Sequence, residues 1–442
     1  MNDFNHLQSL AALAEPRIPD NVPVAEQWST AKGARVMFFQ AHALPMVDVW
    51  LNVRAGSGQE GPQPGMALLL ASLLDEGIAG TDALGIIHEL DRLGARLNKQ
   101  VTRDCITLNL RSLSDPQQLL PALDLLGRML AAPLMPQASV EKMSRACSEN
   151  AHHARLHGPT QLEDACRAHV FAGHPYGRPA YGTQEDFAAI TREQLVDFHQ
   201  RAFCASNLEI SLVGDLSSEQ ARQLTERLCE ALAQGAPLPA VADPGKAPTE
   251  VLHIEQEGAR VDVKLVIPTL YRSDPDYRAL QMAARIFGGS IQGRLFNELR
   301  TRRGLTYGAY AQLVASLGPS LWQMTWSLAP EYNDAAQELV EQMLRDFIEQ
   351  GPTPAELAAH QQAILLETPI AIASNAQILG VLADLNLHRQ PADGIRRYLL
   401  DTQALTVEEV RLALQRHLDL DTLLFASIGP SVAQVALPAL PA

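Results

Sequence analysis

Two similar segments close the two halves of this sequence. LEISLVGDLS occupies residues 208–217, and TLLFASIGPS occupies residues 422–431. Each is an apolar run closed by a glycine and a further turn residue, which is typical of a strand that ends in a turn. Because similarity within one chain indicates repeated structural units, the sequence predicts a molecule that uses one plan twice.

Residues 233–250 separate the two halves. This stretch, AQGAPLPAVADPGKAPTE, contains four prolines and two glycines, a composition typical of linkers. We therefore divide the chain into an N-terminal extension (1–26), an N-terminal domain (27–232), the linker and a C-terminal domain (251–442). Strands and helices are mixed without strict alternation in both halves, which predicts an α+β fold.

The composition excludes several kinds of protein. The chain has 442 residues, of which 47% are hydrophobic and 19% charged, and its net charge is −15. With no basic run, we expect neither nucleic acid nor a membrane as a partner. Residues 1–26 have no basic start and no long apolar stretch, so we expect no signal peptide there. The five cysteines are scattered and form no CxxC, which predicts neither a disulfide framework nor a structural zinc site.

Two helices are predicted after the first strands. The loop AGSGQEGPQPG at 55–65 leads into a helix over 65–76 that is apolar on every side, so we expect this helix to be buried. The next helix is predicted to begin at Thr81 and to turn four leucine and isoleucine side chains inward: Leu84, Ile87, Leu90 and Leu93.

The stretch from Arg285 to Tyr310 places a cation and a phenol on either side of a tight turn. A helix over 291–302 is predicted to end at Gly304, and a strand follows. Arg300 and Tyr307 could then point at one place and stabilise a peptide carbonyl and its developing charge. The alternative is that Arg300 only complements the helix dipole and that Tyr307 only fills a strand.

The segment LRTRRGLTYG at 299–308 resembles the arginine–tyrosine signature of the insulinase/pitrilysin metallopeptidases, the inverzincins. HPYG at 174–177, followed by Gly182, resembles another loop of that family. The resemblance implies two homologous domains, each a largely antiparallel sheet with helices packed on one face, as in the mitochondrial processing peptidase. It also implies that Arg300 and Tyr307 bind substrate and stabilise the tetrahedral intermediate formed at a zinc ion.

The zinc motif of that family is missing. Active members carry His-x-x-Glu-His on the helix after the glycine-rich loop, with two zinc ligands and a base. The matching positions here are Leu68, Ala71 and Ser72. Leucine and alanine cannot bind a cation, so we expect no metal in this chain. Glu149 matches the third ligand, and His152 and His153 follow it, which leaves open either a makeshift Glu/His site or a solvated helix face.

One half of the family's chemistry is therefore lost and the other half is kept. Some members are heterodimers in which one chain holds zinc and the other the arginine–tyrosine pair. We interpret this chain as the non-catalytic subunit of such a peptidase, with a homologous zinc-bearing partner and a peptide or unfolded polypeptide as substrate. The alternative is an inert scaffold or a peptide-binding homologue. We expect a periplasmic protein, with the cytoplasm as the alternative.

Overall fold

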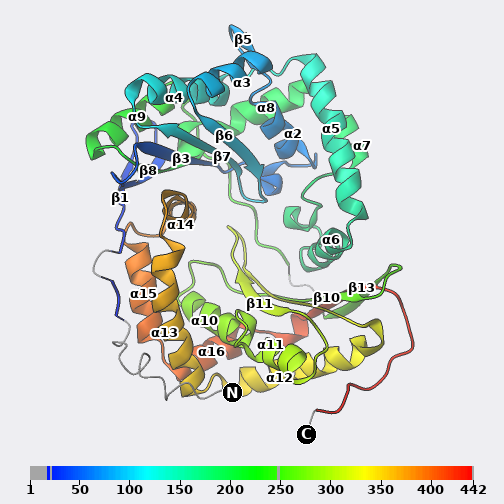
Figure 1. The fold of residues 1–442 in the computed structure, drawn as a ribbon. Coiled ribbons are helices and arrows are strands. Elements are labelled where there is room, and N and C mark those ends of the chain that lie inside the picture. Colours follow the sequence, from blue (N-terminus) through cyan, green and yellow to red (C-terminus); the bar gives the residue numbers. More distant parts are fainter. Residues whose placement is uncertain (1–16, 20–21, 246–248, 441–442) are drawn as a thin grey trace.

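Two α+β domains are stacked in the computed structural model, which describes residues 17–19, 22–245 and 249–440 (Figure 1). Each domain has a central sheet with helices packed against it, as the sequence predicts. Most of the predicted extension over 1–26 lies outside the described residues.

The N-terminal domain is built on a six-stranded sheet. Its strands are β1 (Glu26–Ser29), β2 (Arg35–Gln40), β3 (Met46–Val53), β6 (Arg96–Val101), β7 (Ile106–Leu113) and β8 (Leu208–Gly214). Their order is β1-β2-β8-β3-β7-β6, and every neighbouring pair is antiparallel except the parallel pair β2 and β8. The short strands β4 (Gly77–Ile78) and β5 (Thr81–Asp82) form a separate ribbon.

The C-terminal domain repeats this sheet with five strands. They are β9 (Glu250–Glu255), β10 (Val261–Pro268), β11 (Ala309–Val314), β12 (Leu321–Leu328) and β13 (Leu424–Gly429). Their order is β11-β12-β10-β13-β9, and the one parallel pair is β13 with β9. Read from β11, this is the order β6-β7-β3-β8-β2 of the first sheet, so the internal duplication predicted from the sequence is present in the topology.

The helices follow the same plan. Those of the N-terminal domain are α2 (Met66–Leu73), α3 (Ala83–Arg92), α4 (Pro116–Ala131), α5 (Gln137–Leu156), α6 (Gly158–Val170), α7 (Gln184–Ala189), α8 (Arg192–Ala202) and α9 (Ser218–Glu230). Those of the C-terminal domain are α10 (Tyr277–Gly288), α11 (Arg294–Phe296), the π-helix η4 (Asn297–Arg302), α12 (Asn333–Gln350), α13 (Pro354–Ala371), α14 (Asn375–Leu387), α15 (Gly394–Ala404) and α16 (Val407–His417). The helix α2 follows β3 and contacts α5, and α10 follows β10 and contacts α13, so the two pairs are equivalent.

Each domain contributes one helix that packs on the sheet of the other domain. The helix α14 of the C-terminal domain packs on β8, β3 and β2 of the first sheet, and α6 of the N-terminal domain packs on β13 and β10 of the second (Figure 1). Asn386 on α14 is fully buried, and its Nδ2 donates to the Ile210 carbonyl at 2.9 Å. Glu163 on α6 forms an ion pair with Lys264 on β10. Both faces of the central strands are therefore covered, and every residue of β8 and β13 is buried.

Two local predictions differ from the structure, and some helices, α15 among them, had no predicted counterpart. The helix α3 begins after the cap Asp82, not at Thr81, and leaves Leu84 and Ile87 exposed, so the prediction that these two face inward is wrong. The predicted single helix over 291–302 consists of α11 and η4, because the helix widens into a π turn at Asn297. The helix α15 is an element that the sequence pattern did not predict.

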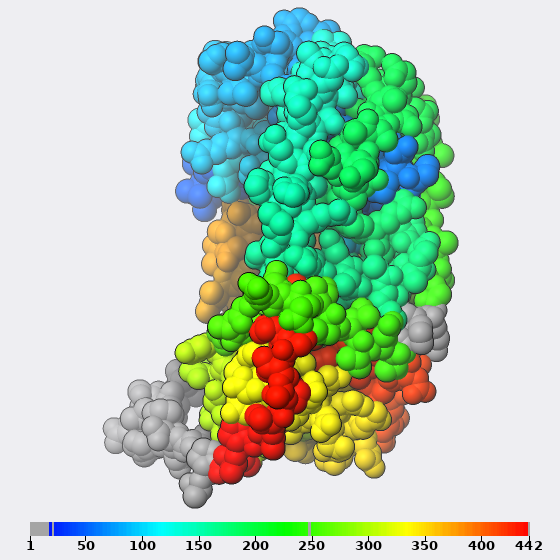
Figure 2. Space-filling view, turned by 90° about the vertical axis from the view of Figure 1, so that its right-hand side faces the viewer, coloured from blue at the N-terminus to red at the C-terminus, as the bar shows by residue number. Residues whose placement is uncertain are grey.

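The C-terminal segment runs over the surface of its own domain (Figure 2). The backbone N–H of Val435 donates to the Glu331 carbonyl at 2.8 Å, and Gln434 accepts from the backbone N–H of Asp334 at 3.0 Å. Of the helices that the structure describes, none is alone long and apolar enough to cross a membrane, while α13 and α14, bent by 117° at their junction, pass that test as a pair by length and composition only.

Candidate functional site

The helix α2 begins at a buried carboxyl group. Glu60 accepts hydrogen bonds from the backbone N–H groups of Gly65 at 3.0 Å and Ala67 at 2.8 Å, two donors that have no partner within the helix. Burial raises the pKa of Glu60 to about 8. The glycine-rich loop therefore fixes the start of α2, although this helix carries no zinc ligands.

The three positions of the degenerate zinc motif form part of the core. Ala71 is buried, and Leu68 packs against the main core of the N-terminal domain. The Ser72 hydroxyl donates to the Leu68 carbonyl one turn earlier at 2.8 Å, and it lies 3.8 Å from the sulfur of Cys147 on α5. Burial raises the pKa of the Cys147 thiol, which keeps it neutral. The side chains here are apolar groups, a hydroxyl that already donates to a backbone carbonyl, and a neutral thiol. A metal would need several charged or imidazole ligands at this place.

Glu149 lies on the exposed side of α5, two residues beyond Cys147. Two residues correspond to about 200° around a helix, so Glu149 and Cys147 face different directions. His152 and His153 are exposed as well, with ring centroids 5.9 Å apart. Within the described parts of the chain, Glu149 and these histidines form no group of three ligand atoms close enough to hold a metal.

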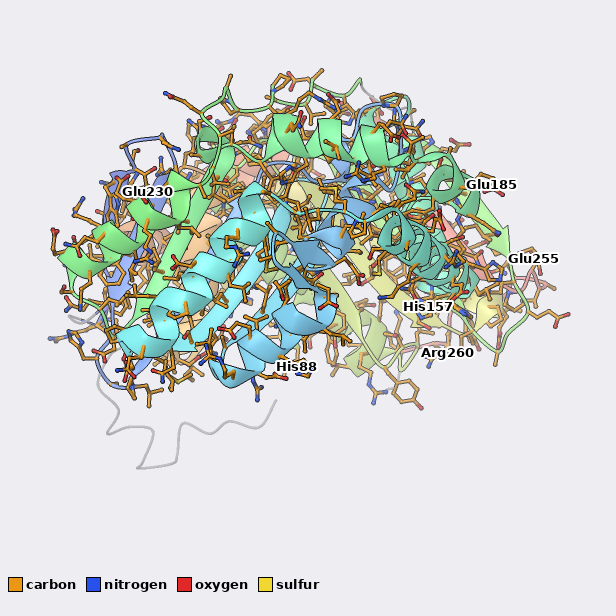
Figure 3. The ribbon with its side chains drawn as sticks, turned by 90° about the horizontal axis from the view of Figure 1, so that it is seen from above. His88, His157, Glu185, Glu230, Glu255 and Arg260 are labelled. Atoms are coloured by element: carbon orange, nitrogen blue, oxygen red, sulfur yellow. The ribbon has the colours of Figure 1, made fainter. Side chains whose placement is uncertain are left out.

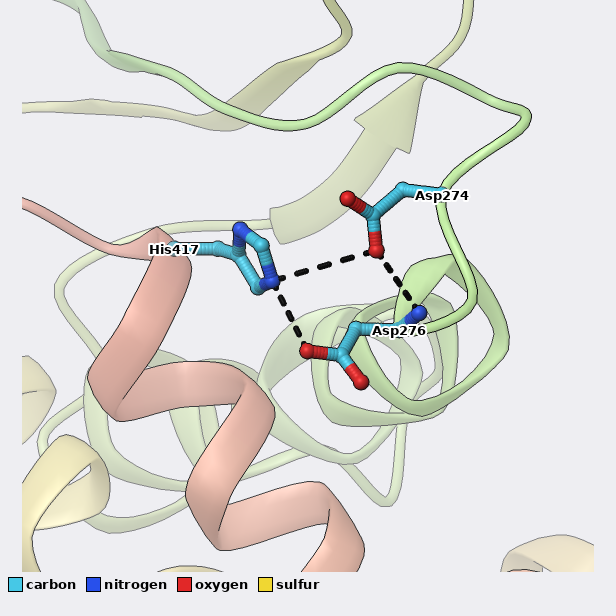
Figure 4. A group of neighbouring side chains, drawn as sticks. All are labelled: Asp274, Asp276 and His417. Carbon is cyan, nitrogen blue, oxygen red and sulfur yellow. Dashed lines mark hydrogen bonds and ion pairs between the residues drawn. The ribbon is translucent and has the colours of Figure 1, made fainter.

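One such group lies elsewhere, at Asp274, Asp276 and His417 (Figure 4). Asp274 accepts from the backbone N–H of Asp276 at 2.8 Å at the start of α10. The Asp276 carboxylate lies 2.9 Å from His417 Nε2 and 2.6 Å from the Arg416 guanidinium. Since Arg416 already neutralises this carboxylate, the group acts as an ion-pair network that joins the start of α10 to the end of α16.

Arg300 and Tyr307 meet at the surface of the C-terminal domain. Arg300 lies in η4, the chain reverses at Gly304 with a φ of 65°, and Tyr307 stands just before β11. The Arg300 guanidinium carbon is 5.2 Å from the centroid of the Tyr307 ring. Tyr307 is 77% exposed, so this phenol is not part of the strand packing.

A second cation completes this site. The guanidinium carbon of Arg260, at the turn before β10, also lies 5.2 Å from the Tyr307 ring centroid. Seen from above, Arg260 stands at the periphery of the molecule (Figure 3). In the part of the chain that the structure describes, neither Arg260 nor Arg300 forms an ion pair with a carboxylate, so both charges remain available. The sequence motif gave no signal for Arg260, because a distant turn brings it to the site.

The HPYG loop joins the two domains and has no free functional group. His174 Nδ1 accepts from the backbone N–H of Tyr176 at 3.2 Å, and Nε2 donates to the Ala242 carbonyl at 2.7 Å. The Tyr176 hydroxyl donates to Asp104, and Asp104 accepts from the backbone N–H of Leu317 in the other domain at 3.1 Å. His174 is therefore a structural residue in a turn.

Comparison with known proteins agrees with the two-domain fold. The family model described as insulinase, peptidase family M16, matches residues 35–184, and the model described as peptidase M16 inactive domain matches residues 189–364. A solved structure from Pseudomonas fluorescens, described as a peptidase M16 inactive domain, has a TM-score of 0.89 and 31% sequence identity and covers 94% of this chain and 100% of its own.

Relatives with and without peptidase names are similar to this chain. A non-peptidase homolog of Helicobacter pylori is 23% identical, with 89% of this chain and 91% of the relative covered. A Mycobacterium tuberculosis protein described as an uncharacterized zinc protease is 25% identical, with 92% and 93% covered.

The fold and the site together define a two-domain peptidase-like protein whose helix α2 carries no histidine, cysteine or carboxylate. The chain belongs to the insulinase family, peptidase family M16. Within that family it is an inactive member, a pseudo-peptidase.

Proposed function

We propose that this chain is the non-catalytic subunit of a heterodimeric zinc peptidase and supplies Arg300 and Tyr307 to the zinc site of a homologous partner. The observation that carries the proposal is the contrast between the two domains. The zinc helix is rebuilt as core around Leu68 and Ala71, whereas Tyr307 stays 77% exposed between two guanidinium groups.

The exposed trio has the chemistry to hold a peptide carbonyl. An arginine is always charged and donates in a fixed fork, which suits a carbonyl or a carboxylate. A phenol donates one further hydrogen bond. Donors aimed at an oxygen that gains charge stabilise the transition state more than the ground state. If Arg300 had no role in binding, its charge would cost little free energy at the exposed surface. No phenol would then be needed beside it.

The zinc ion of this proposal belongs to the partner, where it would supply an activated water. This chain would bind the peptide, orient its carbonyl with Arg300 and donate the Tyr307 proton to the developing oxyanion. A permanent pair of this kind buries on the order of 2,000 Å² or more. We place the pair in the periplasm, with the cytoplasm as the alternative.

The test begins with the partner. The chain is tagged in its native source, the proteins bound to it are identified, and a homologue with His-x-x-Glu-His is expected among them. Co-expressed subunits should then give a complex by light scattering that cleaves an unfolded polypeptide, and neither subunit should cleave it alone. Only monomer in both experiments would end the heterodimer proposal.

Tyr307→Phe in the assembled pair is the decisive variant. It removes one oxygen from an exposed side chain, so assembly and Tm should not change, while kcat should fall about 10²–10³-fold. Arg300→Ala should lower kcat and also raise KM, because the guanidinium holds the ground-state peptide too. Arg260→Met should have a smaller effect, about two- to fivefold, if this arginine only polarises the ring.

Tyr310→Phe is the matched control. Tyr310 is 54% exposed and lies three residues along the same segment, but the proposal gives it no role. Wild-type kcat and KM for Tyr307→Phe would mean that the pair is structural, and the chain would then be a scaffold in the complex.

A further inference from the structure

Because the two domains share one plan, the C-terminal domain has a position equivalent to the family's zinc site in the N-terminal domain. We asked which side chains occupy that position. That site lies between a helix equivalent to α2 and the helix equivalent to α5. The counterparts are α10 and α13, which contact each other in the same way. Two adjoining hollows of about 200 and 290 Å³ open beside this pair, and they share the walls Arg278, Gln281, Arg285, Ile364 and Tyr398.

Two arginines of the larger hollow are neutralised by acids that also line it. Arg272 forms an ion pair with Asp384 at 2.6 Å, and Arg285 forms one with Glu367 at 2.7 Å. The Nε of Arg285 is nevertheless buried and has no hydrogen-bond partner among the described residues. A buried donor without a partner carries a free-energy cost, which a ligand atom at this position would remove.

Arg278 has a different environment. Its guanidinium donates to Gln281 Oε1 at 2.9 Å and lies 4.6 Å from the ring centroid of Tyr398, and no carboxylate in the described chain pairs with it. It stands in the first turn of α10, where the helix dipole disfavours a cation. Burial, followed by the charge of Arg272, lowers its pKa. In a protein with a net charge of −15, the lining of the larger hollow thus carries three arginines against two carboxylates, Glu367 and Asp384, and Arg278 is the arginine without an ion-pair partner among the described residues.

The rest of the larger hollow is apolar. The side chains of Ile372, Val381, Leu385 and Ile395 line it, together with Ile364. The hydroxyl of Tyr398 makes no hydrogen bond to any residue that the structure describes. The lining therefore combines hydrogen-bond donors and a net positive charge with an aliphatic surface, which is the usual design of a site for a small amphipathic ligand.

We propose that this hollow binds a monocarboxylate with an apolar body. The carboxylate lies against Arg278, which can bind it through two parallel hydrogen bonds, and near the Tyr398 hydroxyl and the free Nε of Arg285. The body lies along Ile372, Val381 and Ile395. The site does not involve Arg300 or Tyr307. Its test is therefore independent of the test of the proposed peptidase partnership.

Calorimetric titration of the full chain tests this site with three probes. Octanoate carries both parts of the ligand, 1-octanol has the same body without the charge, and inorganic phosphate has charge without the body. Octanoate should bind, and the other two should bind at least about tenfold more weakly, since a charge-assisted contact is worth that much. Equal binding of octanol would overturn the proposal, because it would mean that the cavity binds the apolar body and does not recognise the carboxylate.

Arg278→Met is the principal variant, because it keeps an unbranched stem and leaves no acid unpaired. It should weaken octanoate binding about tenfold or more while Tm stays at or above the wild-type value. Tyr398→Phe, which removes one oxygen, should weaken it less. Arg411→Met, at a surface pair with Glu408, is the control and should bind as the wild type does. Unchanged octanoate affinity in Arg278→Met, or no binding in the millimolar range to the wild type, would contradict the proposal.

Discussion

Gly214 and Gly429 occupy the same position in the two domains and have nearly the same backbone, with φ angles of 155° and 156°. A Cβ on Gly214 would lie 2.3 Å from the Met46 carbonyl oxygen, where β3 begins. A Cβ on Gly429 would lie 2.7 Å from the Arg260 carbonyl oxygen, next to the start of β10. The glycines that close the two similar segments of the sequence are thus required by the same close approach of two strands.

Gly214→Ala and Gly429→Ala should each lower the free energy of unfolding by about 2 kcal/mol or more, because they add a backbone clash to a strained φ. Urea unfolding would measure the change. Gly94→Ala is the control: its φ is 63°, and a Cβ there would meet none of the described atoms within 4 Å, so it reports strain alone. If Gly214→Ala costs no more than Gly94→Ala, the close approach has no energetic weight.

The purified chain should contain no stoichiometric zinc. Leu68, Ala71 and Ser72 supply neither charge nor imidazole at α2, and the group of α5 that lies 3.8 Å from the Ser72 hydroxyl is the thiol of Cys147. Elemental analysis after gel filtration checks this. One equivalent of zinc that survives dialysis, and that is lost in Glu149→Gln, would show that the makeshift Glu/His site exists.

Glu60 should make the stability of the N-terminal domain depend on pH. Its pKa is about 8 in the folded chain and about 4.3 in an unfolded one. Between these values the folded state holds a proton that the unfolded state has released, so the free energy of unfolding falls as pH rises from about 4.5 to about 8.

Glu60→Gln should remove that part of the pH dependence. The urea midpoint of the wild type should fall more between about pH 5 and about pH 8 than that of Glu60→Gln. Glu193→Gln, at an exposed position, should follow the wild type. Parallel curves for the wild type and Glu60→Gln would mean that the two backbone donors and the helix start keep this carboxyl group charged.

Asn386→Leu should weaken the contact between the domains. Asn386 donates to the Ile210 carbonyl and accepts from Arg35 Nε at 3.0 Å, so the change leaves buried polar groups without partners at a cost of about 1–3 kcal/mol. Calorimetry should show a lower Tm and a broader transition. Asn98→Leu, at an exposed position on β6, is the control, and an unchanged transition in Asn386→Leu would contradict this role.

Local chemistry made part of this molecule predictable from its sequence. The turn at Gly304 needs a left-handed residue, and it fixes Arg300 and Tyr307 on either side of it, so the pair could be placed from a motif. The cap of α4 is likewise local: Asp115 accepts from the backbone N–H of Gln117 at 2.8 Å, and Pro116 follows it. The duplication was visible because the equivalent strands β8 and β13 are both mostly apolar and both end at a glycine.

Tertiary contacts decided the rest. The spacing of Leu84 and Ile87 suits a buried helix face, but α3 buries Ile86 in a small cluster with Leu125 and Met129 instead. Arg260 reaches Tyr307 only because the turn before β10 comes near the end of η4, which no local pattern records. The hollow beside Arg278 needs α15, whose first turn is not capped by a side chain: Asp393 accepts from Arg397 Nε at 2.7 Å and not from a backbone N–H.

The packing of α6 and α14 on the sheet of the opposite domain has a consequence for the order of events during synthesis. When β8 leaves the ribosome, the first sheet is complete, but the face around β8 and β3 has nothing to cover it until residues 375–387 have been made. During that interval this face exposes apolar side chains such as Met37 and Val213 beside the polar Ser211, and exposed apolar surface is what chaperones and other nascent chains recognise. A gene fragment that ends at the linker would produce this intermediate as its final product, so we expect such a fragment to aggregate where the full chain does not.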